Sequence, residues 1–250
     1  MNIVVAVKQI PDLQQIRIRN RQPVLEGVSL TLGGIDKNAL EAAVVLKENL
    51  GGKVTVLSAG NDELEDTVKE ALAAGADEAF LVIDEELDKA GSGKVASVLA
   101  AAVKRMEAID LLIFGEGSGD NYSGQVGSRV AEILGWPQVG YVKAIEVNGE
   151  VLKATRSLED GEEVVEVNMP AVLAVISGIN EARIPSVTQI LKAGKKPKEI
   201  LEIDDLGIDI PEDQVFALSN LAPENERKGL IVKDVAGLVK ALKSENLIGG

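Results

Sequence analysis

The sequence predicts an α/β fold built on a doubly wound, mostly parallel sheet. Over the first 135 residues, short apolar runs typical of strands buried on both faces alternate with apolar stripes at helical spacing. Strand, loop and helix repeat four times in this way, and such units join parallel strands by right-handed crossovers. The pattern then changes to consecutive strands joined by short turns, so a β-meander is predicted late in the fold.

The four repeating units can be assigned in order along the chain. Their strands are predicted at residues 3–7, 54–57, 79–83 and 111–114. Their helices are predicted at residues 36–50, 64–72, 95–106 and 126–134. Aspartate favours helix N-caps and glycine favours helix ends, so we expect Asp36 to cap the first helix and Gly51 to end it.

The later part of the chain has a different pattern. Strands are predicted at residues 139–147, 151–156, 163–167 and 171–176. Asn148-Gly149 and Glu159–Gly161 are the hairpin turns between the first three of these strands. From 177 to 197 neither a helical nor a strand period is convincing. Beyond 197 we expect an extended C-terminal arm that ends in an amphipathic helix with Val232 and Leu242 in its apolar stripe.

Composition excludes several classes of function. The chain has 26 Lys and Arg against 40 Asp and Glu, and its net charge of −14 does not suit binding to nucleic acid or to an anionic membrane. It contains no Cys and no His, which excludes disulfides, thiol nucleophiles, zinc fingers and Ser-His-Asp triads. A carboxylate site for Mg²⁺ or Ca²⁺ stays open, but no segment has EF-hand spacing. No catalytic residue and no metal ligand is predicted.

Neither a signal peptide nor a membrane span is expected. The chain enters a strand at Asn2, with no basic segment before it and no cleavage site of small residues after it. No apolar run approaches the roughly 18 residues that a membrane helix needs. The expected location is therefore the cytoplasm.

The strongest local signal is the glycine-rich segment Gly115–Gly127, which follows a buried strand and precedes a helix. Ligands of open α/β sheets bind at the carboxyl ends of strands, where the strand order reverses. Glycines let the backbone approach a ligand, and N–H groups at a helix N-terminus suit phosphate. Ser118, Ser123 and Gln125 add neutral hydrogen-bonding groups. We interpret the segment as a nucleotide-binding loop, with a plain tight turn as the alternative; it is neither a dinucleotide fingerprint nor a P-loop.

Other loops at the carboxyl ends of strands are expected to reach the same site. Ala6-Val7-Lys8 ends the first strand, Ala59-Gly60 ends the second, and Gly33–Asp36 leads into the first helix. Lys8 could pair with a phosphate or remain an ordinary solvated lysine. Ala6 and Ala59 are small where a flat base would need room.

Three stretches of the chain carry a family resemblance. They are Val7–Asp12, then Gly124–Gly127 with Leu134–Gln138, and, most specifically, the stretch from Met169 to Ala193. These stretches resemble the β subunits of electron transfer flavoproteins (ETFs) of the bacterial and archaeal type. The resemblance extends over about residues 1–245.

The resemblance implies an electron carrier rather than an enzyme. An ETF β subunit pairs with an α subunit, and the heterodimer carries electrons from flavin dehydrogenases, such as acyl-CoA dehydrogenases, to a membrane quinone oxidoreductase or another acceptor. The redox FAD is held mainly by the α subunit near the interface. The β subunit buries AMP or, in electron-bifurcating members, a second FAD. A prokaryotic cytoplasmic location is also implied, with no nucleic acid partner and no membrane insertion.

The resemblance further implies a division of the chain and a set of site residues. Residues 1–197 would form a Rossmann-like adenine-nucleotide-binding domain, and residues 198–250 an arm that packs on the partner subunit. A recognition loop at 183–190 would bind dehydrogenases through Arg183, Ile184, Val187 and Ile190. The implied cofactor-binding residues are Ala6, Val7, Lys8, Gly33, Gly34, Ile35, Asp36, Ala59, Gly60, Gly115, Ser118, Asp120, Asn121, Ser123, Gly124, Gln125, Val126 and Gly127.

Several alternatives stay open at this point. Asp120–Gly124 follows neither the AMP-binding nor the bifurcating pattern, so AMP and a second FAD are both candidates. Val187 stands where simple carriers usually have Leu, which leaves the dehydrogenase unidentified. An adenylating or ATP-hydrolysing enzyme of the same fold is the alternative function, although no phosphate-activating motif is evident. A small stress-type nucleotide-binding module is a third reading, but the meander and arm exceed that unit.

Overall fold

The computed structural model describes residues 1–250 except 89, 211, 214, 216, 225–228 and 249–250. The described residues form two units by their contacts. Unit 1 comprises residues 1–17 and 25–218, and unit 2 comprises residues 18–24 and 219–250. The large sheet and the helices that cover it belong to unit 1, which therefore holds the candidate site.

Unit 1 is built on a nine-stranded sheet with the order β11-β10-β9-β12-β8-β1-β6-β7-β13. Neighbouring strands are parallel from β9 through to β13, whereas β10 pairs antiparallel with both β9 and β11. The strands are β1 (Asn2–Ala6), β6 (Lys53–Gly60), β7 (Glu78–Ile83), β8 (Leu111–Gly115), β9 (Gln138–Asn148), β10 (Val151–Ser157), β11 (Glu162–Asn168), β12 (Ala171–Val175) and β13 (Lys198–Leu201). This confirms the predicted mostly parallel α/β fold with a late meander.

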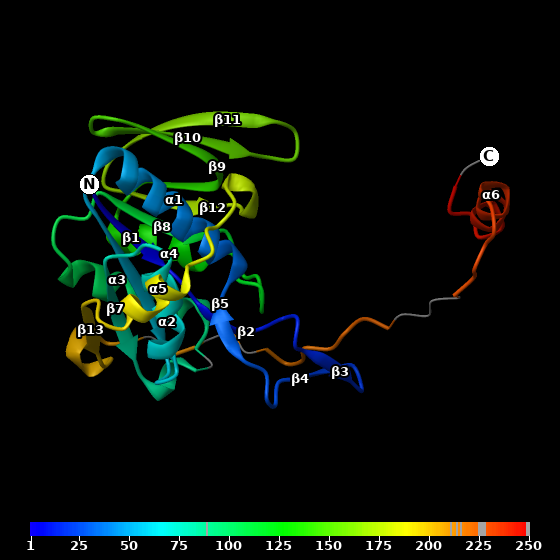
Figure 1. The fold of residues 1–250 in the computed structure, drawn as a ribbon, viewed down its shortest axis with the longest axis horizontal. Coiled ribbons are helices and arrows are strands. Elements are labelled where there is room, and N and C mark those ends of the chain that lie inside the picture. Colours follow the sequence, from blue (N-terminus) through cyan, green and yellow to red (C-terminus); the bar gives the residue numbers. More distant parts are fainter. Residues whose placement is uncertain (89, 211, 214, 216, 225–228, 249–250) are drawn as a thin grey trace. The chain divides into compact units, whose positions relative to one another are not determined.

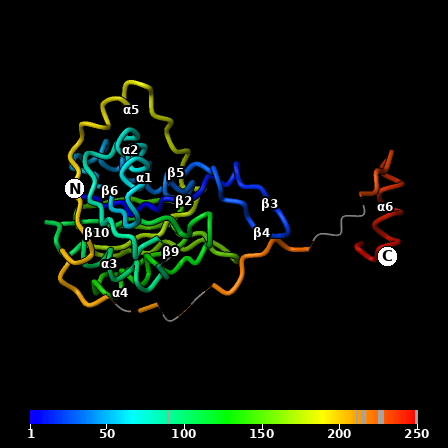
Figure 2. Tube along the Cα trace, turned by 90° about the horizontal axis from the view of Figure 1, so that it is seen from below, coloured from blue at the N-terminus to red at the C-terminus, as the bar shows by residue number. Residues whose placement is uncertain are grey.

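Helices cover both faces of this sheet (Figure 1). The helices of unit 1 are α1 (Gly34–Leu50), α2 (Leu64–Ala73), α3 (Ser92–Arg105), α4 (Val126–Leu134) and α5 (Val187–Ala193), with 3₁₀ turns η1 (Glu85–Leu87), η2 (Ser177–Ile179) and η3 (Asp204–Leu206). Figure 2 shows α1 and α2 on one side of β1 and β6, and α3 and α4 on the other. Each side encloses an apolar core, so the sheet is doubly wound as predicted.

The central strand β1 shows why a continuous apolar run is needed at this position. Ile3 and Val5 point into the core under α1 and α2, whereas Val4 and Ala6 point into the core under α3 and α4. The chain proceeds from β1 to β6 and β7 on one side, then returns to β8 on the other side of β1. The strand order therefore reverses between β1 and β8, which is where open α/β sheets bind ligands.

Helix α4 connects this reversal point to the meander. The helix ends at Gly135, whose φ of 69° is the left-handed conformation that favours glycine at a C-cap. The N–H of Trp136 then donates to the carbonyl of Ala131 at 3.0 Å. Trp136, the one tryptophan of the chain, packs against the core under α3 and α4. The turn brings the chain into β9, whose hairpin with β10 contains the predicted Asn148-Gly149.

Several elements differ from the prediction or were not predicted. Asp36 does not cap α1, because Gly33 is the N-cap and no side chain caps it. The antiparallel pair β2 (Gln9–Pro11) and β5 (Leu30–Leu32) leads from β1 into α1. Strands this short carry no readable period.

The stretch from 177 to 206 is more ordered than its sequence pattern indicates. Ser186 caps α5 in a capping box with Gln189, and Ala193 at the end of this helix is fully buried. The chain then adds β13 to the sheet edge beside β7, and Ile203 and Leu206 enter the core under α3. Residues 198–206 thus pack within unit 1.

Unit 2 contains a short hairpin and a helix. Strands β3 (Arg17–Arg19) and β4 (Gln22–Val24) form the hairpin. The carbonyl of Arg21 accepts the N–H of Ala222 at 2.7 Å, and its side chain donates back to the Ala222 carbonyl at 2.8 Å. Asp234 caps the predicted amphipathic helix, α6 (Val235–Ser244), in which no residue is buried.

Among the described residues, no helix has both the length and the apolar character to cross a membrane.

Candidate functional site

A cavity of about 610 Å³ opens at the carboxyl ends of the strands, at the reversal between β1 and β8. The residues of the sequence prediction that line it are Ala6, Val7, Lys8, Asp36, Ala59, Gly115, Ser118, Asp120, Asn121, Ser123, Gly124, Gln125, Val126 and Gly127. The predicted Gly33, Gly34, Ile35 and Gly60 are not part of its lining. The loops expected to reach one site therefore do meet, and the volume lies within the roughly 300–1,000 Å³ of typical ligand pockets.

The glycine-rich loop runs along this cavity with little room for side chains. Gly124 has a φ of 63°, the left-handed conformation that favours glycine, and a Cβ there would lie 3.2 Å from the carbonyl oxygen of Glu116. A Cβ on Gly115 would lie only 2.7 Å from Oδ1 of Asp36. The glycines are thus required by the backbone path and by a buried carboxyl group.

The loop ends at the N-terminus of α4. Gln125 is the N-cap, and no side chain of the described residues caps the helix. Its first N–H groups are therefore available to an anion, which the helix dipole also favours. Gln125 is itself held in place, because its amide oxygen accepts from Ser92 at 3.1 Å and from Arg129 at 2.9 Å.

Lys8 brings a positive charge to the same part of the cavity. Its ammonium group lies 2.5 Å from Oδ2 of Asp120. Partial burial alone would raise the pKa of Asp120, but hydrogen bonds from Lys8 and Ser118 hold it below its usual value. Lys8 is thus a paired cation, and an incoming phosphate would compete with Asp120 for it.

Asp36 joins two parts of the cavity wall, at Lys8 and Gly115, to the start of α1. Its Oδ2 accepts the backbone N–H of Lys8 at 2.8 Å, and its carboxyl group lies against Gly33 and also accepts the N–H of Gly115. The side chain is 7% exposed, and burial raises its pKa to about 7 against the opposing hydrogen bonds and the charge of Lys8. This inward contact explains why Asp36 is not the cap of α1.

Sequence reasoning missed two sides of the cavity. One side comes from η1, the loop residues Asp88 and Ala90, and α3, and it consists of Leu87, Asp88, Ala90, Ser92, Val95 and Leu99. The other comes from β9, β10 and β12 and consists of Gln138, Gly140, Tyr141, Arg156 and Ala174. Nε of Arg156 is buried and finds no hydrogen-bond partner among the described residues. Ser92 follows β7 along the chain, so the rule that ligands bind at the carboxyl ends of strands could have indicated it. Arg156 lies near the cavity only because of the order of the strands in the sheet, which the sequence does not show.

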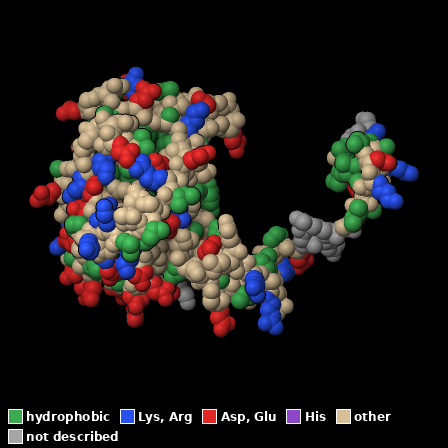
Figure 3. Space-filling model, viewed as in Figure 1, with side chains coloured by type: hydrophobic (Ala, Val, Ile, Leu, Met, Phe, Trp, Pro, Cys, Tyr) green, Lys and Arg blue, Asp and Glu red, His purple; other side chains and the backbone are tan. Residues whose placement is uncertain are grey.

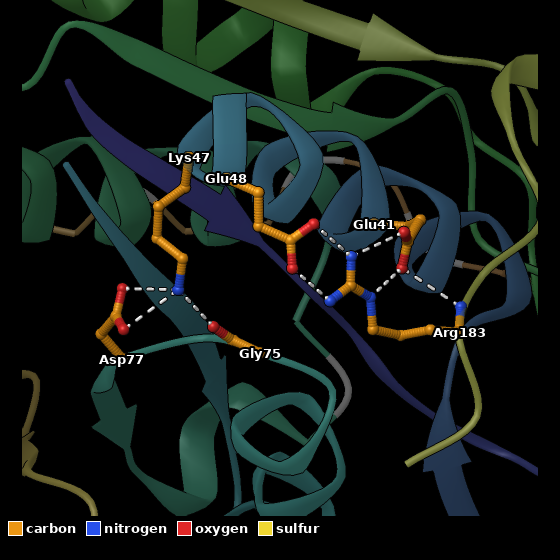
Figure 4. Close-up of polar contacts among 6 residues, drawn as sticks. All are labelled: Glu41, Lys47, Glu48, Gly75, Asp77 and Arg183. Carbon is orange, nitrogen blue, oxygen red and sulfur yellow. Dashed lines mark hydrogen bonds and ion pairs between the residues drawn. The ribbon is translucent and has the colours of Figure 1, made fainter. Parts of the chain in front are cut away.

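The segment 183–190 lies outside the cavity and presents apolar side chains to solvent. Ile184, Val187 and Ile190 are 93%, 74% and 53% exposed. Arg183 does not join this row, since its guanidinium turns toward α1 and meets Glu41 and Glu48 (Figure 4). Of the four predicted partner-binding residues, three are therefore exposed and apolar and one is engaged within the chain.

Acidic side chains are prominent on the surface of unit 1. Figure 3 shows Asp and Glu gathered along the lower edge of the face drawn, in agreement with the net charge of −14. Among the described residues, no group of three or more Asp and Glu could hold a metal ion. This surface suits neither a phosphate backbone nor an anionic lipid headgroup.

Comparisons with known proteins point to one family. A family model for the electron transfer flavoprotein domain matches residues 24–206. An electron transfer flavoprotein subunit beta from Thermoanaerobacterium thermosaccharolyticum is 38% identical, over 99% of this chain and 100% of that protein. A subunit beta from Clostridium acetobutylicum is 42% identical over 84% and 81% of the two chains. Subunit CarD of a caffeyl-CoA reductase-Etf complex from Acetobacterium woodii is 35% identical over 99% and 100%.

Proposed function

Because this chain belongs to the electron transfer flavoprotein family, with β subunits among its full-length relatives, we propose that it pairs with an ETF α subunit as an electron carrier. In this role the heterodimer accepts electrons from flavin dehydrogenases and passes them to a quinone oxidoreductase or another acceptor. In this role the chain itself would supply a nucleotide site and surfaces for its partners.

The observation that carries this proposal is the cavity at the β1–β8 reversal. It combines an uncapped helix N-terminus, a glycine-rich loop and Lys8, and these features suit the phosphates of an adenine nucleotide. Phosphate oxygens would accept from the first N–H groups of α4 and from Lys8. The apolar wall formed by Leu87, Val95 and Leu99 suits a flat ring.

The residues that line the cavity favour FAD over AMP as its ligand. The wall extends from α3 across the glycine-rich loop to Tyr141 and Arg156, which would offer contacts to a second nucleotide half as well as to an adenylate. The buried Nε of Arg156 offers an unused donor at the far end. A second FAD in addition to that of the α subunit would be the cofactor set of an electron-bifurcating ETF. The relative named as part of a caffeyl-CoA reductase-Etf complex agrees with assembly into a larger electron-transfer complex.

Two surfaces are available for partners. In α6, Val235, Leu238 and Val239 are exposed, and an α subunit that covered them would help to enclose its own FAD. The segment 183–190, from here on the docking segment, would bind a dehydrogenase through Ile184, Val187 and Ile190. Exposed apolar side chains on a short, ordered segment are typical of docking anchors.

The test of this function is the nucleotide content of the purified heterodimer. Denaturation followed by chromatography should release one adenine nucleotide from the β subunit, and two FAD per heterodimer if the β site holds FAD. Gly124→Val should lower that content severalfold, because it adds a side chain beside the ligand and strains the backbone.

Gly149→Val is the matched control for this substitution. Gly149 has nearly the same φ, 66°, but lies in the β9–β10 hairpin with open space around it. The Gly149→Val variant should have the same backbone strain as Gly124→Val but the same nucleotide content as the parent. Equal nucleotide content in all three proteins would contradict the proposed site. ATP turnover by a colourless protein would support the alternative adenylating or ATP-hydrolysing enzyme.

A further inference from the structure

Arg183, at the start of the docking segment, is committed to two carboxylates of helix α1. Its Nε and Nη2 donate to the two oxygens of Glu41 at 2.7 and 2.9 Å. Its Nη1 and Nη2 donate to the two oxygens of Glu48 at 2.7 and 3.1 Å, as Figure 4 shows. Its backbone N–H also donates to Glu41, at 3.2 Å. The guanidinium therefore grips both carboxylates in the bidentate geometry that favours strong ion pairs.

This arrangement leaves the side chain little capacity for other contacts. A guanidinium has five N–H donors, and the four bonds described above occupy four of them. Hydrogen bonds from Arg183 hold the pKa of Glu48 below its usual value, and those from Glu48 and Glu41 raise the pKa of Arg183. Glu41 is buried, so loss of Arg183 would leave its charge without compensation. The contacts thus favour a structural use of Arg183 within the chain.

The docking segment is held on both sides of its exposed apolar row. Before it, Asn38 of α1 and Asn180 exchange side-chain hydrogen bonds to each other's carbonyl at 2.8 and 3.0 Å. After it, the ammonium group of Lys196 donates to the carbonyls of Leu72 and Ala76 at 2.8 and 2.5 Å. The exposed apolar side chains between Asn180 and Lys196 therefore lie on a segment that is already ordered in the absence of a partner.

We propose that Arg183 is a positioning residue of the docking segment, which acts through Glu41 and Glu48 and does not contact the partner. The inference rests on the proposed docking function of this segment. A segment already held in its bound shape loses less conformational entropy on association, which strengthens binding without any new contact. Arg183 thereby raises the affinity of the docking segment for its partner, although the side chain of Arg183 is not part of the contact surface.

The first test measures amide hydrogen exchange in the heterodimer, with the dehydrogenase absent. In Arg183→Gln the amides of residue 184 and of residues 186–191 should exchange about tenfold faster, while those of β1 and β8 stay protected. Glu48→Gln should give a smaller acceleration of the same amides. Lys153→Gln, which removes an ion pair with Glu166 on the meander, is the control and should leave them unchanged. Unaltered exchange in Arg183→Gln would overturn the proposal.

The second test measures electron transfer from an acyl-CoA dehydrogenase reduced with butyryl-CoA. Arg183→Gln and Glu48→Gln should both raise the KM for the dehydrogenase and leave kcat unchanged. A rise with Arg183→Gln but not with Glu48→Gln would mean that Arg183 contacts the partner, which overturns the positioning role. A third outcome combines two results: faster amide exchange in Arg183→Gln, and the same KM for the dehydrogenase in Val187→Ala as in the parent. It would support the positioning role of Arg183 and refute docking at this segment.

Discussion

Asp36 should make the protein less stable as the pH rises from about 4 to about 7. Its carboxyl ionises near pH 3.8 in the unfolded chain, whereas burial raises its pKa to about 7 in the folded chain. Between these values the folded state keeps a proton that the unfolded state has lost, so the free energy of unfolding falls as the pH rises. Asp36→Asn keeps an acceptor for the Lys8 N–H but cannot ionise. Its stability relative to the parent should rise by roughly 1 kcal/mol per pH unit in this range.

Denaturant titrations of both proteins at pH 5, 6, 7 and 8 measure this difference. Asp120→Asn is the control, because the pKa of Asp120 is held below its usual value of 3.8, so this carboxyl is ionised in both the folded and the unfolded chain across the titrated range. The stability of the Asp120→Asn variant relative to the parent should stay constant from pH 5 to 8 and rise only when the pH falls below about 4. Parallel curves for Asp36→Asn and the parent would show that Asp36 is ionised throughout, and that the cavity wall contains a buried charge.

At the residue scale, the sequence could indicate only the part of the cavity that lies close to strand ends. The glycine-rich loop and Lys8 follow apolar runs directly, so the carboxyl-end rule applies to them without further knowledge. Arg156 lies on an internal strand of the meander, and it reaches the cavity because β9 pairs with β12. The role of Asp36 was misjudged for a related reason. Its side chain turns toward the backbone of Lys8, just after β1, which is 28 residues away in sequence.

At the scale of single elements, Val187 offers a direct test of the docking segment. It is the first residue of α5 and is mostly exposed, so Val187→Ala should hardly change the melting temperature. Loss of its apolar surface should weaken partner binding by on the order of 1 kcal/mol, a severalfold rise in the KM for the reduced dehydrogenase. The electron-transfer rate as a function of dehydrogenase concentration gives this value.

Val164→Ala is the matched control for this substitution. Val164 is similarly exposed but lies on β11, at the opposite edge of the sheet from β13. Its substitution should change neither the KM for the dehydrogenase nor the melting temperature. A lower melting temperature for Val187→Ala, with the KM unchanged, would place Val187 in a satellite core and remove its role as an anchor.

Elements were predictable from the sequence where burial imposes a period. The strands and helices around the two cores were found because their apolar residues repeat at every position or at helical spacing. Helix α5 has seven residues, of which only Ala193 is buried, so it has no apolar stripe to detect. Strand β13 is an edge strand with Lys198 and Glu199 in it, and edge strands often carry charge that hides their alternation.

At the scale of the whole molecule, two truncations should have different effects. A chain that ends at Leu218 keeps β13 and the buried Ile203 and Leu206, so unit 1 should melt close to the parent temperature. A chain that ends at Pro197 loses these contacts and should be less stable by on the order of 3–5 kcal/mol. Thermal melts of the two isolated chains measure the difference.

The same truncations test what the C-terminal part does for assembly. Without residues 219–250 the chain should bind the α subunit more weakly, because the exposed apolar side chains of α6 are lost. Analytical ultracentrifugation of equimolar mixtures with the α subunit gives the affinity. Full affinity in the chain that ends at Leu218 would show that the partner contacts lie entirely in residues 1–218.

The position of Trp136 makes the β subunit its own optical reporter. The indole follows the C-terminal end of α4, whose first turn borders the cavity, and a nine-residue helix is only about 14 Å long. Flavins absorb light at the wavelengths where an indole emits, whereas AMP is transparent there. In the isolated chain, a bound flavin would therefore quench the tryptophan fluorescence of Trp136 by energy transfer, whereas bound AMP would leave that fluorescence unchanged. The fluorescence intensity alone would distinguish the two nucleotides.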